Sequence, residues 1–339
     1  MIRKYGLQLP HGIELSCRSA GEKGRPALVF LHGFPEAAFV WDALLEHFAK
    51  PENGGYRCIA PNLRGFERSS APTDVSAYRP KHLVKDIAAL IALESERSDG
   101  PPLASSAPLG GTLRQAQDNR AGEVGKRGGQ LECLVAHDWG GAVAWNLAAS
   151  QPQLTKKLAI INSPHPGTFL RELQHSPAQQ ASSAYMNFLI RPDAEKLLAE
   201  DDFRRLFEFF MPFSSVKGIN SDIKGPRVAP DWLSAEVKAQ YRDVWQRGLT
   251  GPLNFYRASP LRPGPEVADL VIPRELLDVN LRTLVLWGMG DIALPPALLD
   301  GLIDYVPRME LKKIEGATHW IIHEQPALVI QYLQDFLAT

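Results

Sequence analysis

The chain has few of the features that mark secreted or membrane proteins. Its 339 residues include only three cysteines, Cys17, Cys58 and Cys133, which are far apart and form no C-x-x-C pair. We therefore expect buried, reduced thiols and no disulfide framework. The N-terminus has no apolar segment followed by a small-residue cleavage site, which argues against a secretory signal. No uninterrupted apolar run is long enough to span a bilayer. These absences predict a soluble, cytoplasmic protein.

An excess of charge of one sign is also missing. The 37 Lys and Arg residues nearly balance 38 Asp and Glu residues, so the formal net charge is −1, and no block of like charge stands out. A nucleic acid or an anionic membrane surface is therefore not an expected partner. The expected partners are a small molecule and water, and the sequence leaves the oligomeric state open.

Short apolar runs alternate with amphipathic, helix-like stretches along most of the chain. Apolar runs of this length are typical of strands that are buried on both faces of a parallel sheet. Helices are predicted over Tyr78–Glu94, opened by Pro80, and over Gln325–Leu337. The alternation predicts an α/β fold with a mostly parallel central sheet flanked by helices. The predicted strands are Ala27–Leu31, Arg57–Ala60, Leu131–Ala136, Leu158–Ile161 and Thr283–Trp287.

This alternation breaks in two places. Residues 165–263 are almost purely helical in pattern, with proline-rich borders. We expect them to form a helical cap (lid) domain, inserted into a core domain made of residues 1–164 and 264–339. Residues 97–130 are rich in Gly, Pro, Ser and Ala, without an apolar period. Because so long a loop is uncommon inside a compact domain, we predict a flexible surface insertion within the core, with a substrate-gating flap as the alternative.

The most informative segment joins the predicted strand Leu131–Ala136 to an alanine-rich helix pattern. Its sequence, Ala136-His-Asp138-Trp-Gly140, places one carboxylate among small residues. This is the layout of a nucleophile elbow, a sharp strand-to-helix turn that lifts a reactive side chain above the sheet. The usual G-x-S-x-G pattern occurs nowhere in the chain. We therefore expect Asp138 to be the nucleophile, since a carboxylate is charged at neutral pH and attacks an sp³ carbon without an activating base.

A second motif, His32-Gly-Phe-Pro-Glu36, directly follows another predicted strand. Gly33 permits a tight turn there, although the same residues would also suit an ordinary Gly-Pro loop. Beside the elbow, this turn would point the backbone N–H of Phe34 at the nucleophile. Together with the N–H of Trp139, it would form an oxyanion hole.

Two more candidate residues follow strands in the C-terminal part of the chain. Asp291 comes after the strand Thr283–Trp287, and His319 comes after the short run Met309–Ile314. The order of Asp138, Asp291 and His319 along the chain is that of the nucleophile, acid and histidine in the α/β-hydrolase triad. Asp291 would then orient His319 and stabilise its cation, while His319 activates a water molecule.

A metal site is the rival interpretation of the last motif. His319 and His323 are four residues apart beside Glu324, a spacing that could place two metal ligands on one helix. However, His319 stands in a loop after a strand and Pro326 begins the next helix, so the two histidines need not share a face. We predict no metal and no organic cofactor. His32 and His137 are interpreted as structural loop residues.

Five motifs of the chain are taken together here: His32-Gly-Phe-Pro-Glu36, His137-Asp-Trp-Gly-Gly141, Asn162-Ser-Pro-His-Pro166, Gly251-Pro-Leu-Asn-Phe-Tyr256 and Thr318-His-Trp320. They closely resemble the soluble epoxide hydrolases of the α/β-hydrolase superfamily, and the resemblance covers nearly the whole chain apart from residues 97–130. The resemblance implies that two cap tyrosines, Tyr185 and Tyr256, reach over the nucleophile and donate hydrogen bonds to the epoxide oxygen. Either tyrosine alone would otherwise be an ordinary aromatic residue of the cap core. A phenol, with a pKa of about 10, is protonated at neutral pH and can supply a proton to an alkoxide.

The expected function is therefore the conversion of an epoxide and water to a vicinal diol through a covalent hydroxyalkyl ester on Asp138. The main alternative is a haloalkane dehalogenase, which uses the same Asp–His–Asp triad but typically carries Asn where Phe34 stands. Haloacetate dehalogenases need arginines on and after the elbow, and residues 139–149 contain none. A non-catalytic small-molecule receptor is a further alternative, although every catalytic group of the family is present.

Overall fold

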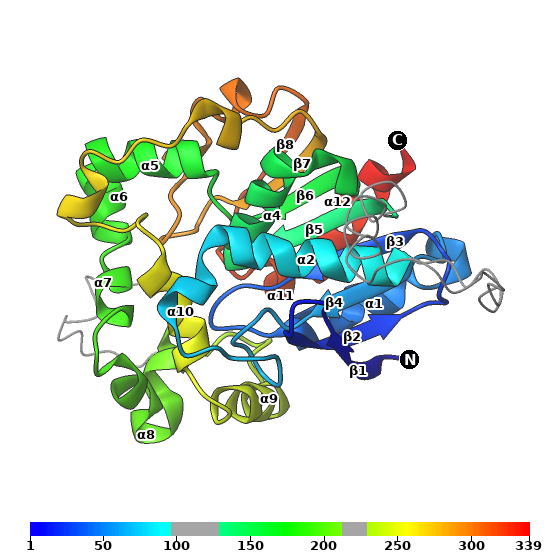
Figure 1. The fold of residues 1–339 in the computed structure, drawn as a ribbon, viewed down its shortest axis with the longest axis horizontal. Coiled ribbons are helices and arrows are strands. Elements are labelled where there is room, and N and C mark those ends of the chain that lie inside the picture. The colour runs from blue at the N-terminus through cyan, green and yellow to red at the C-terminus, as the bar shows by residue number, and fades with distance from the viewer. Residues whose placement is uncertain (96–128, 212–228) are drawn as a thin grey trace, which may run out of the picture.

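The computed structural model describes residues 1–95, 129–211 and 229–339, and its centre is one eight-stranded sheet (Figure 1). The β1–β2 and β2–β4 pairs are antiparallel, and the five remaining pairs are parallel. In spatial order the strands are β1 (Arg3–Gln8), β2 (Glu14–Ala20), β4 (Arg57–Pro61), β3 (Ala27–Leu31), β5 (Leu131–His137), β6 (Thr155–Ile161), β7 (Arg282–Gly288) and β8 (Met309–Ile314).

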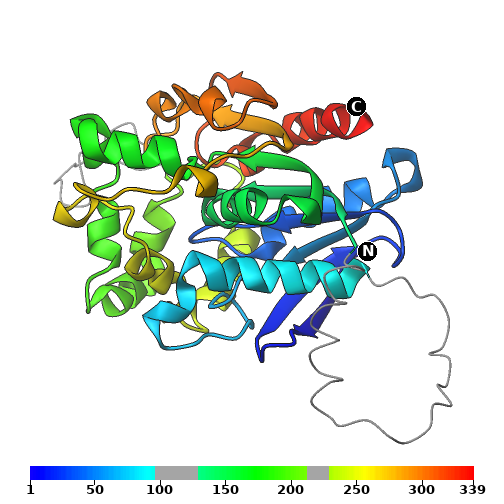
Figure 2. The same cartoon turned by 45° about the horizontal axis from the view of Figure 1, so that its top comes forward.

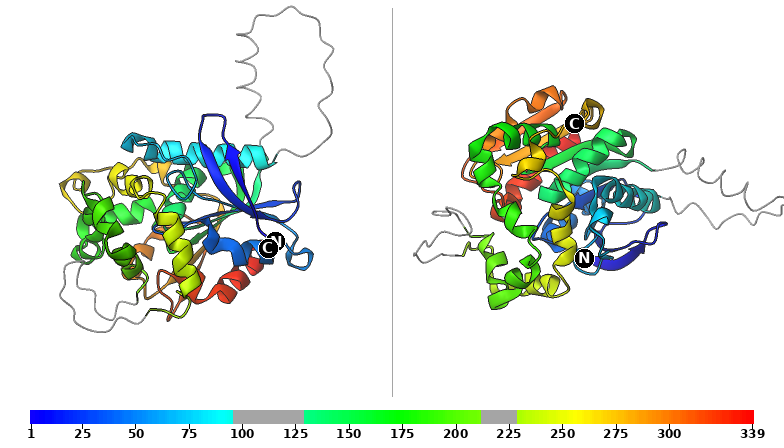
Figure 3. Two further views of the ribbon diagram at one scale, coloured as in Figure 1. Left: turned by 90° about the horizontal axis from the view of Figure 1, so that it is seen from below. Right: turned by 60° about the vertical axis from the view of Figure 1, so that its left-hand side comes forward.

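Every predicted strand is confirmed, with ends that differ by at most three residues. All residues of β3 and β4 are buried, because helices cover both faces of the parallel part of the sheet. The helices α2 (Pro80–Ser95) and α4 (Asp138–Ser150) lie on one face, and α1 (Asp42–Phe48) and α12 (Pro326–Ala338) lie on the other (Figure 3). The mostly parallel α/β sheet flanked by helices is therefore confirmed.

Between β6 and β7 the chain leaves the sheet and forms a series of helices. Figures 1 and 2 show these helices gathered on one side of the sheet, as expected of an inserted helical cap. The exact domain boundaries at residues 165 and 263 remain a prediction, and the proposed insertion 97–130 lies outside the described residues except at its last two positions. The helices are α5 (Pro166–His175), α6 (Pro177–Ser182), α7 (Tyr185–Leu189), α8 (Ala194–Glu208), α9 (Ala235–Trp245) and α10 (Thr250–Ala258).

The ends of the parallel strands bring distant loops together. The segments that follow β3, β5, β7 and β8 carry the Phe34, Asp138, Asp291 and His319 motifs, respectively. Because these neighbouring strands are parallel, their carboxyl ends lie at the same edge of the sheet. In the ranges that the structure describes, no helix has the length and apolarity needed to cross a membrane.

Candidate active site

The elbow holds Asp138 in an uncommon backbone conformation. Strand β5 ends one residue before it, α4 begins with it, and its φ is +48°, in the left-handed region. The tight packing explains the two glycines that follow. A Cβ atom at Gly140 would lie 2.5 Å from the carbonyl oxygen of Leu31, and one at Gly141 would lie 2.3 Å from Cβ of Ser163. The small residues therefore let the elbow press against the neighbouring strand ends.

The predicted oxyanion turn contacts the nucleophile directly. The backbone N–H of Phe34 donates a hydrogen bond to Oδ1 of Asp138 at 2.7 Å. The turn is closed by the N–H of Glu36, which donates to the carbonyl of Gly33 at 3.2 Å. The other predicted donor, the N–H of Trp139, belongs to the first turn of α4, where backbone N–H groups have no partner within the helix.

Gly33 leaves room for the nucleophile, which gives a first test of this geometry. A Cβ atom at position 33 would lie 2.2 Å from Oδ1 and 2.3 Å from Cβ of Asp138. Gly33→Ala should therefore push the carboxylate or the turn aside and lower kcat/KM about 100-fold, because small misplacements of reacting groups are costly. The control is Gly24→Ala, at an exposed position where nothing meets the new methyl group, although its φ of +82° lies in the left-handed region and that of Gly33 does not. Unchanged kcat/KM in Gly33→Ala would contradict the placement of Asp138 beside this turn.

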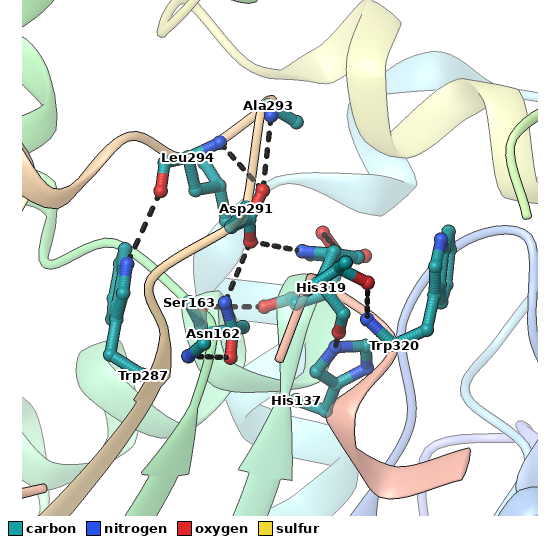
Figure 4. Close-up of polar contacts among 12 residues, drawn as sticks. His137, Asn162, Ser163, Trp287, Asp291, Ala293, Leu294, His319 and Trp320 are labelled. Atoms are coloured by element: carbon teal, nitrogen blue, oxygen red, sulfur yellow. Dashed lines mark hydrogen bonds and ion pairs between the residues drawn. The ribbon is translucent and has the colours of Figure 1, made fainter. Parts of the chain in front are cut away.

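Hydrogen bonds to both carboxylate oxygens orient the side chain of Asp291 toward His319. Its Oδ2 lies 2.7 Å from Nδ1 of His319 and also accepts from the Asn162 side-chain amide at 2.8 Å (Figure 4). Its Oδ1 accepts the backbone N–H groups of Ala293 and Leu294, at 3.0 and 2.9 Å. The carboxylate is almost fully buried, so these four donors compensate its lost hydration and fix its direction.

His319 connects the acid to the nucleophile. While Nδ1 contacts Asp291, Nε2 lies 3.7 Å from Oδ2 of Asp138, which is too long for a direct hydrogen bond. Burial lowers the pKa of His319, but the charge and hydrogen bond of Asp291, followed by the charge of Asp138, outweigh it and raise this pKa to about 9. In the free protein, His319 is therefore protonated at neutral pH. The three predicted triad residues thus lie together.

Both predicted tyrosines lie above the elbow on cap helices. Tyr256, on α10, is buried, and its ring centroid is 5.2 Å from that of Phe34 and 5.0 Å from that of Trp139. Tyr185, on α7, is partly buried, with its ring centroid 6.3 Å from that of Tyr256. Burial, with a further contribution from the Asp138 charge, raises the pKa of both phenols, so both stay protonated at neutral pH.

Comparison with known proteins decides the family. The family model described as the alpha/beta hydrolase fold matches residues 26–326. The chain belongs to the α/β-hydrolase family of enzymes. It is 31% identical to the AB hydrolase superfamily protein YfhM of Bacillus subtilis (strain 168), over 96% of this chain and 95% of that protein. It is 30% identical to epoxide hydrolase 3 of Xenopus tropicalis, over 96% of this chain and 75% of that protein.

A solved structure leads to the same family. The crystal structure of an epoxide hydrolase from Bacillus megaterium in complex with an inhibitor superposes with a TM-score of 0.75 at 25% sequence identity. The superposition covers 99% of this chain and all of that one. The similarity therefore extends over the sheet and the helices between β6 and β7.

This α/β-hydrolase also has a buried polar cluster that the sequence analysis missed. His137 is the last residue of β5, so its interpretation as a loop residue is wrong. Its Nε2 lies 2.9 Å from the carbonyl oxygen of His319, and its Nδ1 lies 3.0 Å from Oε2 of Glu36. A carbonyl oxygen only accepts, so Nε2 carries a hydrogen, and one further proton must lie between Nδ1 and Glu36. His32, in contrast, accepts the Leu63 N–H at 3.1 Å, as expected of a structural residue.

The residues of the rival metal site point to different partners. Nε2 of His323 lies 2.6 Å from Oε1 of Glu36, and Glu324 accepts the backbone N–H and the hydroxyl of Thr318. His319 faces Asp291 instead. Over residues 1–95, 129–211 and 229–339, no three His, Cys, Asp or Glu side chains converge as a metal site requires.

Proposed function

We propose that this α/β-hydrolase converts epoxides and water to vicinal diols through a covalent ester on Asp138. The observation that carries the proposal is a carboxylate in the nucleophile position, with a protonated phenol packed over it. Asp138 supplies a charged nucleophile. The ring of Tyr256 packs against the rings of Phe34 and Trp139, the two residues whose backbone N–H groups form the predicted oxyanion hole. The names of the epoxide hydrolase relatives support this reaction class.

The hydrogen bonds distinguish the two oxygens of Asp138 in the first step. Oδ1 is held by the Phe34 N–H and becomes the carbonyl oxygen, whereas Oδ2 attacks the epoxide carbon. As the new C–O bond forms, the carbon–oxygen bond of the epoxide breaks and its electron pair moves to the epoxide oxygen. A proton from Tyr256 or Tyr185 neutralises that oxygen. The raised pKa of both phenols keeps this proton available before the reaction.

Ester formation prepares His319 for the second step. Because the ester has no charge, the contribution of Asp138 to the high pKa of His319 is lost, so that pKa falls below its free-enzyme value of about 9. His319 gives its proton to the tyrosinate left by the first step and becomes neutral. It then takes a proton from water as the water oxygen bonds to Cγ of Asp138. The oxyanion forms on Oδ1, beside the Phe34 and Trp139 N–H groups. Collapse breaks the bond between Cγ and Oδ2, and the departing oxygen takes the proton from His319, which releases the diol. The carboxylic acid left on Asp138 then gives its proton to His319, which restores the free enzyme.

The decisive experiment is a panel of terminal, aryl and trans-disubstituted epoxides together with haloalkanes. Each reaction is scored for diol by chromatography and for halide by titration. We expect diol from one or more epoxide classes, because phenols over the nucleophile stabilise a developing alkoxide. Halide release without diol formation would establish the dehalogenase alternative, and tight binding without turnover would establish the receptor.

Tyr256→Phe removes one proton donor and keeps the aromatic packing. Ester formation should slow by about 100-fold or more, the usual contribution of a general acid, while ester hydrolysis changes only a few-fold. Rapid-quench measurement of the ester and the diol separates the two steps. Tyr332→Phe, on α12 outside the site, is the matched control. Equal slowing of both steps would mean that the Tyr256 hydroxyl serves only packing.

A further inference from the structure

Glu36 is a buried carboxylate that the two proposed steps do not use. It is completely inaccessible to solvent and stands two residues after Phe34, whose N–H contacts the nucleophile. A charged carboxylate away from water is tolerated only when donors surround it. Burial raises the pKa of Glu36, but hydrogen bonds from His137 and His323 outweigh this and hold the pKa well below its usual range. The side chain is therefore an anion in the free protein.

Three side chains from three elements provide those donors. His323, on the short helix α11 (Ile321–Glu324), makes the shortest contact, 2.6 Å from its Nε2 to Oε1 of Glu36. The hydroxyl of Tyr241, on cap helix α9, donates to the same oxygen at 3.3 Å. His137, at the end of β5, contacts Oε2 at 3.0 Å. One carboxylate thus joins the oxyanion turn, the elbow strand, the His319 segment and the cap.

The segment that carries His319 is attached to Glu36 at two points. His137 contacts Glu36, and its ring centroid is 4.7 Å from that of His319. It also contacts the backbone carbonyl of His319 (Figure 4). Four residues further along the chain, His323 contacts Glu36 directly. The direction of the Glu36 carboxylate therefore influences where the His319 ring stands relative to Asp138.

The cap holds the His323 ring in the orientation that this contact requires. The ring stacks on Trp232, with centroids 4.2 Å apart and planes inclined by 12°. Its Nε2 also lies 3.4 Å from the Tyr241 hydroxyl. Besides Tyr241, the described titratable side chains that contact Glu36 are His137 and His323 alone.

We propose that His323, supported by Tyr241, is a positioning residue for ester hydrolysis, which acts by donating a hydrogen bond to Glu36 and so fixing the oxyanion turn and the His319 segment. The inference rests on the proposed function, in which His319 acts only in ester hydrolysis and the oxyanion on Oδ1 forms only there. Loss of the His323 donor should therefore affect the second step selectively. Because the proposal depends on the Nε2–H group of His323, a glutamine side chain, which also carries an N–H donor, should take over its hydrogen bond to Glu36.

The test compares His323→Leu with His323→Gln in single turnover, measuring ester formation and ester hydrolysis separately. Losing a hydrogen bond to a charged group should slow hydrolysis about tenfold or more in His323→Leu, with ester formation within about threefold of wild type. His323→Gln should restore hydrolysis to within about threefold. His175→Leu, at an exposed position on α5, is the matched control.

The pH profile of hydrolysis provides a readout that a loss of packing would not move. The negative charge of Glu36 is among the causes that raise the pKa of His319. In His323→Leu the Glu36 carboxylate keeps its charge, because His137 and Tyr241 still donate to it, but this charge is less compensated, so the midpoint for hydrolysis should move to higher pH. In His323→Gln the midpoint should stay at the wild-type value.

Tyr241→Phe keeps the test decisive if His323→Leu does not fold, because it removes a single oxygen atom. The Tyr241 hydroxyl lies farther from Glu36 than Nε2 of His323 does, so we expect a smaller effect, a slowing of ester hydrolysis alone by about two- to threefold. Tyr332→Phe is the control. Equal slowing of both steps, or failure of His323→Gln to restore hydrolysis, would overturn the inference. If the wild-type protein forms no ester with any epoxide, the proposed function itself is wrong. If the wild type forms the ester and the His323 variants hydrolyse it at the wild-type rate, only the role of His323 is wrong.

Discussion

Asp138→Asn is expected to reduce diol formation by about 10⁴-fold or more, the scale of loss when a nucleophile is removed. A neutral amide is a poor nucleophile toward carbon, and nothing else at the elbow replaces it. The variant should fold normally, since asparagine tolerates a φ of +48° as well as aspartate does. Its amide oxygen can still accept the Phe34 N–H.

The measurement combines product analysis with intact-protein mass spectrometry and thermal unfolding. We expect an unchanged unfolding temperature, no diol and no covalent adduct. The Asn variant should also show a lower pKa for His319 by NMR titration, because it lacks the Asp138 charge that helps to raise this pKa to about 9. Substantial diol formation by a folded variant would show that water attacks the epoxide directly.

Isotope labelling of the wild type tests the same step without a mutation. In the proposed mechanism the water oxygen bonds to Cγ of Asp138, and one oxygen of the original carboxylate leaves with the diol. A single turnover in ¹⁸O-water should therefore label the peptide that contains Asp138. Label found only in the diol would exclude the ester intermediate.

The sequence predicted that the three triad candidates lie together because each follows a predicted strand or a short strand-like run. Asp138 and Asp291 come after β5 and β7, and His319 comes after β8. Parallel strands place such loops at one edge of the sheet, whatever their separation along the chain. Topology was therefore sufficient to predict that these residues meet, and the structure places a carboxylate oxygen of Asp291 2.7 Å from Nδ1 of His319. Their catalytic roles stay a prediction.

The strands β1 and β2 were missed for a local reason. In β2, buried and half-buried residues alternate, with Leu15 and Cys17 buried among polar neighbours. The edge strand β1 is largely exposed. Neither has the continuous apolar run that identified the other strands, and a two-residue period over six or seven positions is a weak signal.

The Glu36 cluster was missed because its contacts join positions that are very distant in sequence. Glu36 and His323 are 287 positions apart, and Glu36 and Tyr241 are 205 apart. Tyr241 lies on an amphipathic helix, where an aromatic residue is indistinguishable from ordinary core packing. Asn162 belongs to one of the five motifs, but the sequence predicted no role for it. The structure shows that its side-chain amide donates a hydrogen bond to Asp291.

His319→Gln should separate the two steps of the reaction. In a serine hydrolase the histidine activates the nucleophile, so its loss stops the first step. Here Asp138 is a carboxylate that needs no base, and His319 is required only when water attacks the ester. The variant should open the epoxide and stall at the ester, giving a burst of about one equivalent per active site, followed by turnover at least about 100-fold slower than wild type.

The geometry supports this division of labour. His319 Nε2 is 3.7 Å from Asp138 Oδ2, a distance that leaves the carboxylate free to react without first giving or taking a proton. The trapped adduct should add the full mass of the epoxide to the peptide containing Asp138. Asp291→Asn provides a graded comparison: it keeps the imidazole but removes the charge that stabilises its cation, so hydrolysis should slow less than in His319→Gln. A folded His319→Gln variant with neither burst nor adduct would show that His319 acts in the first step, as it does in the serine enzymes.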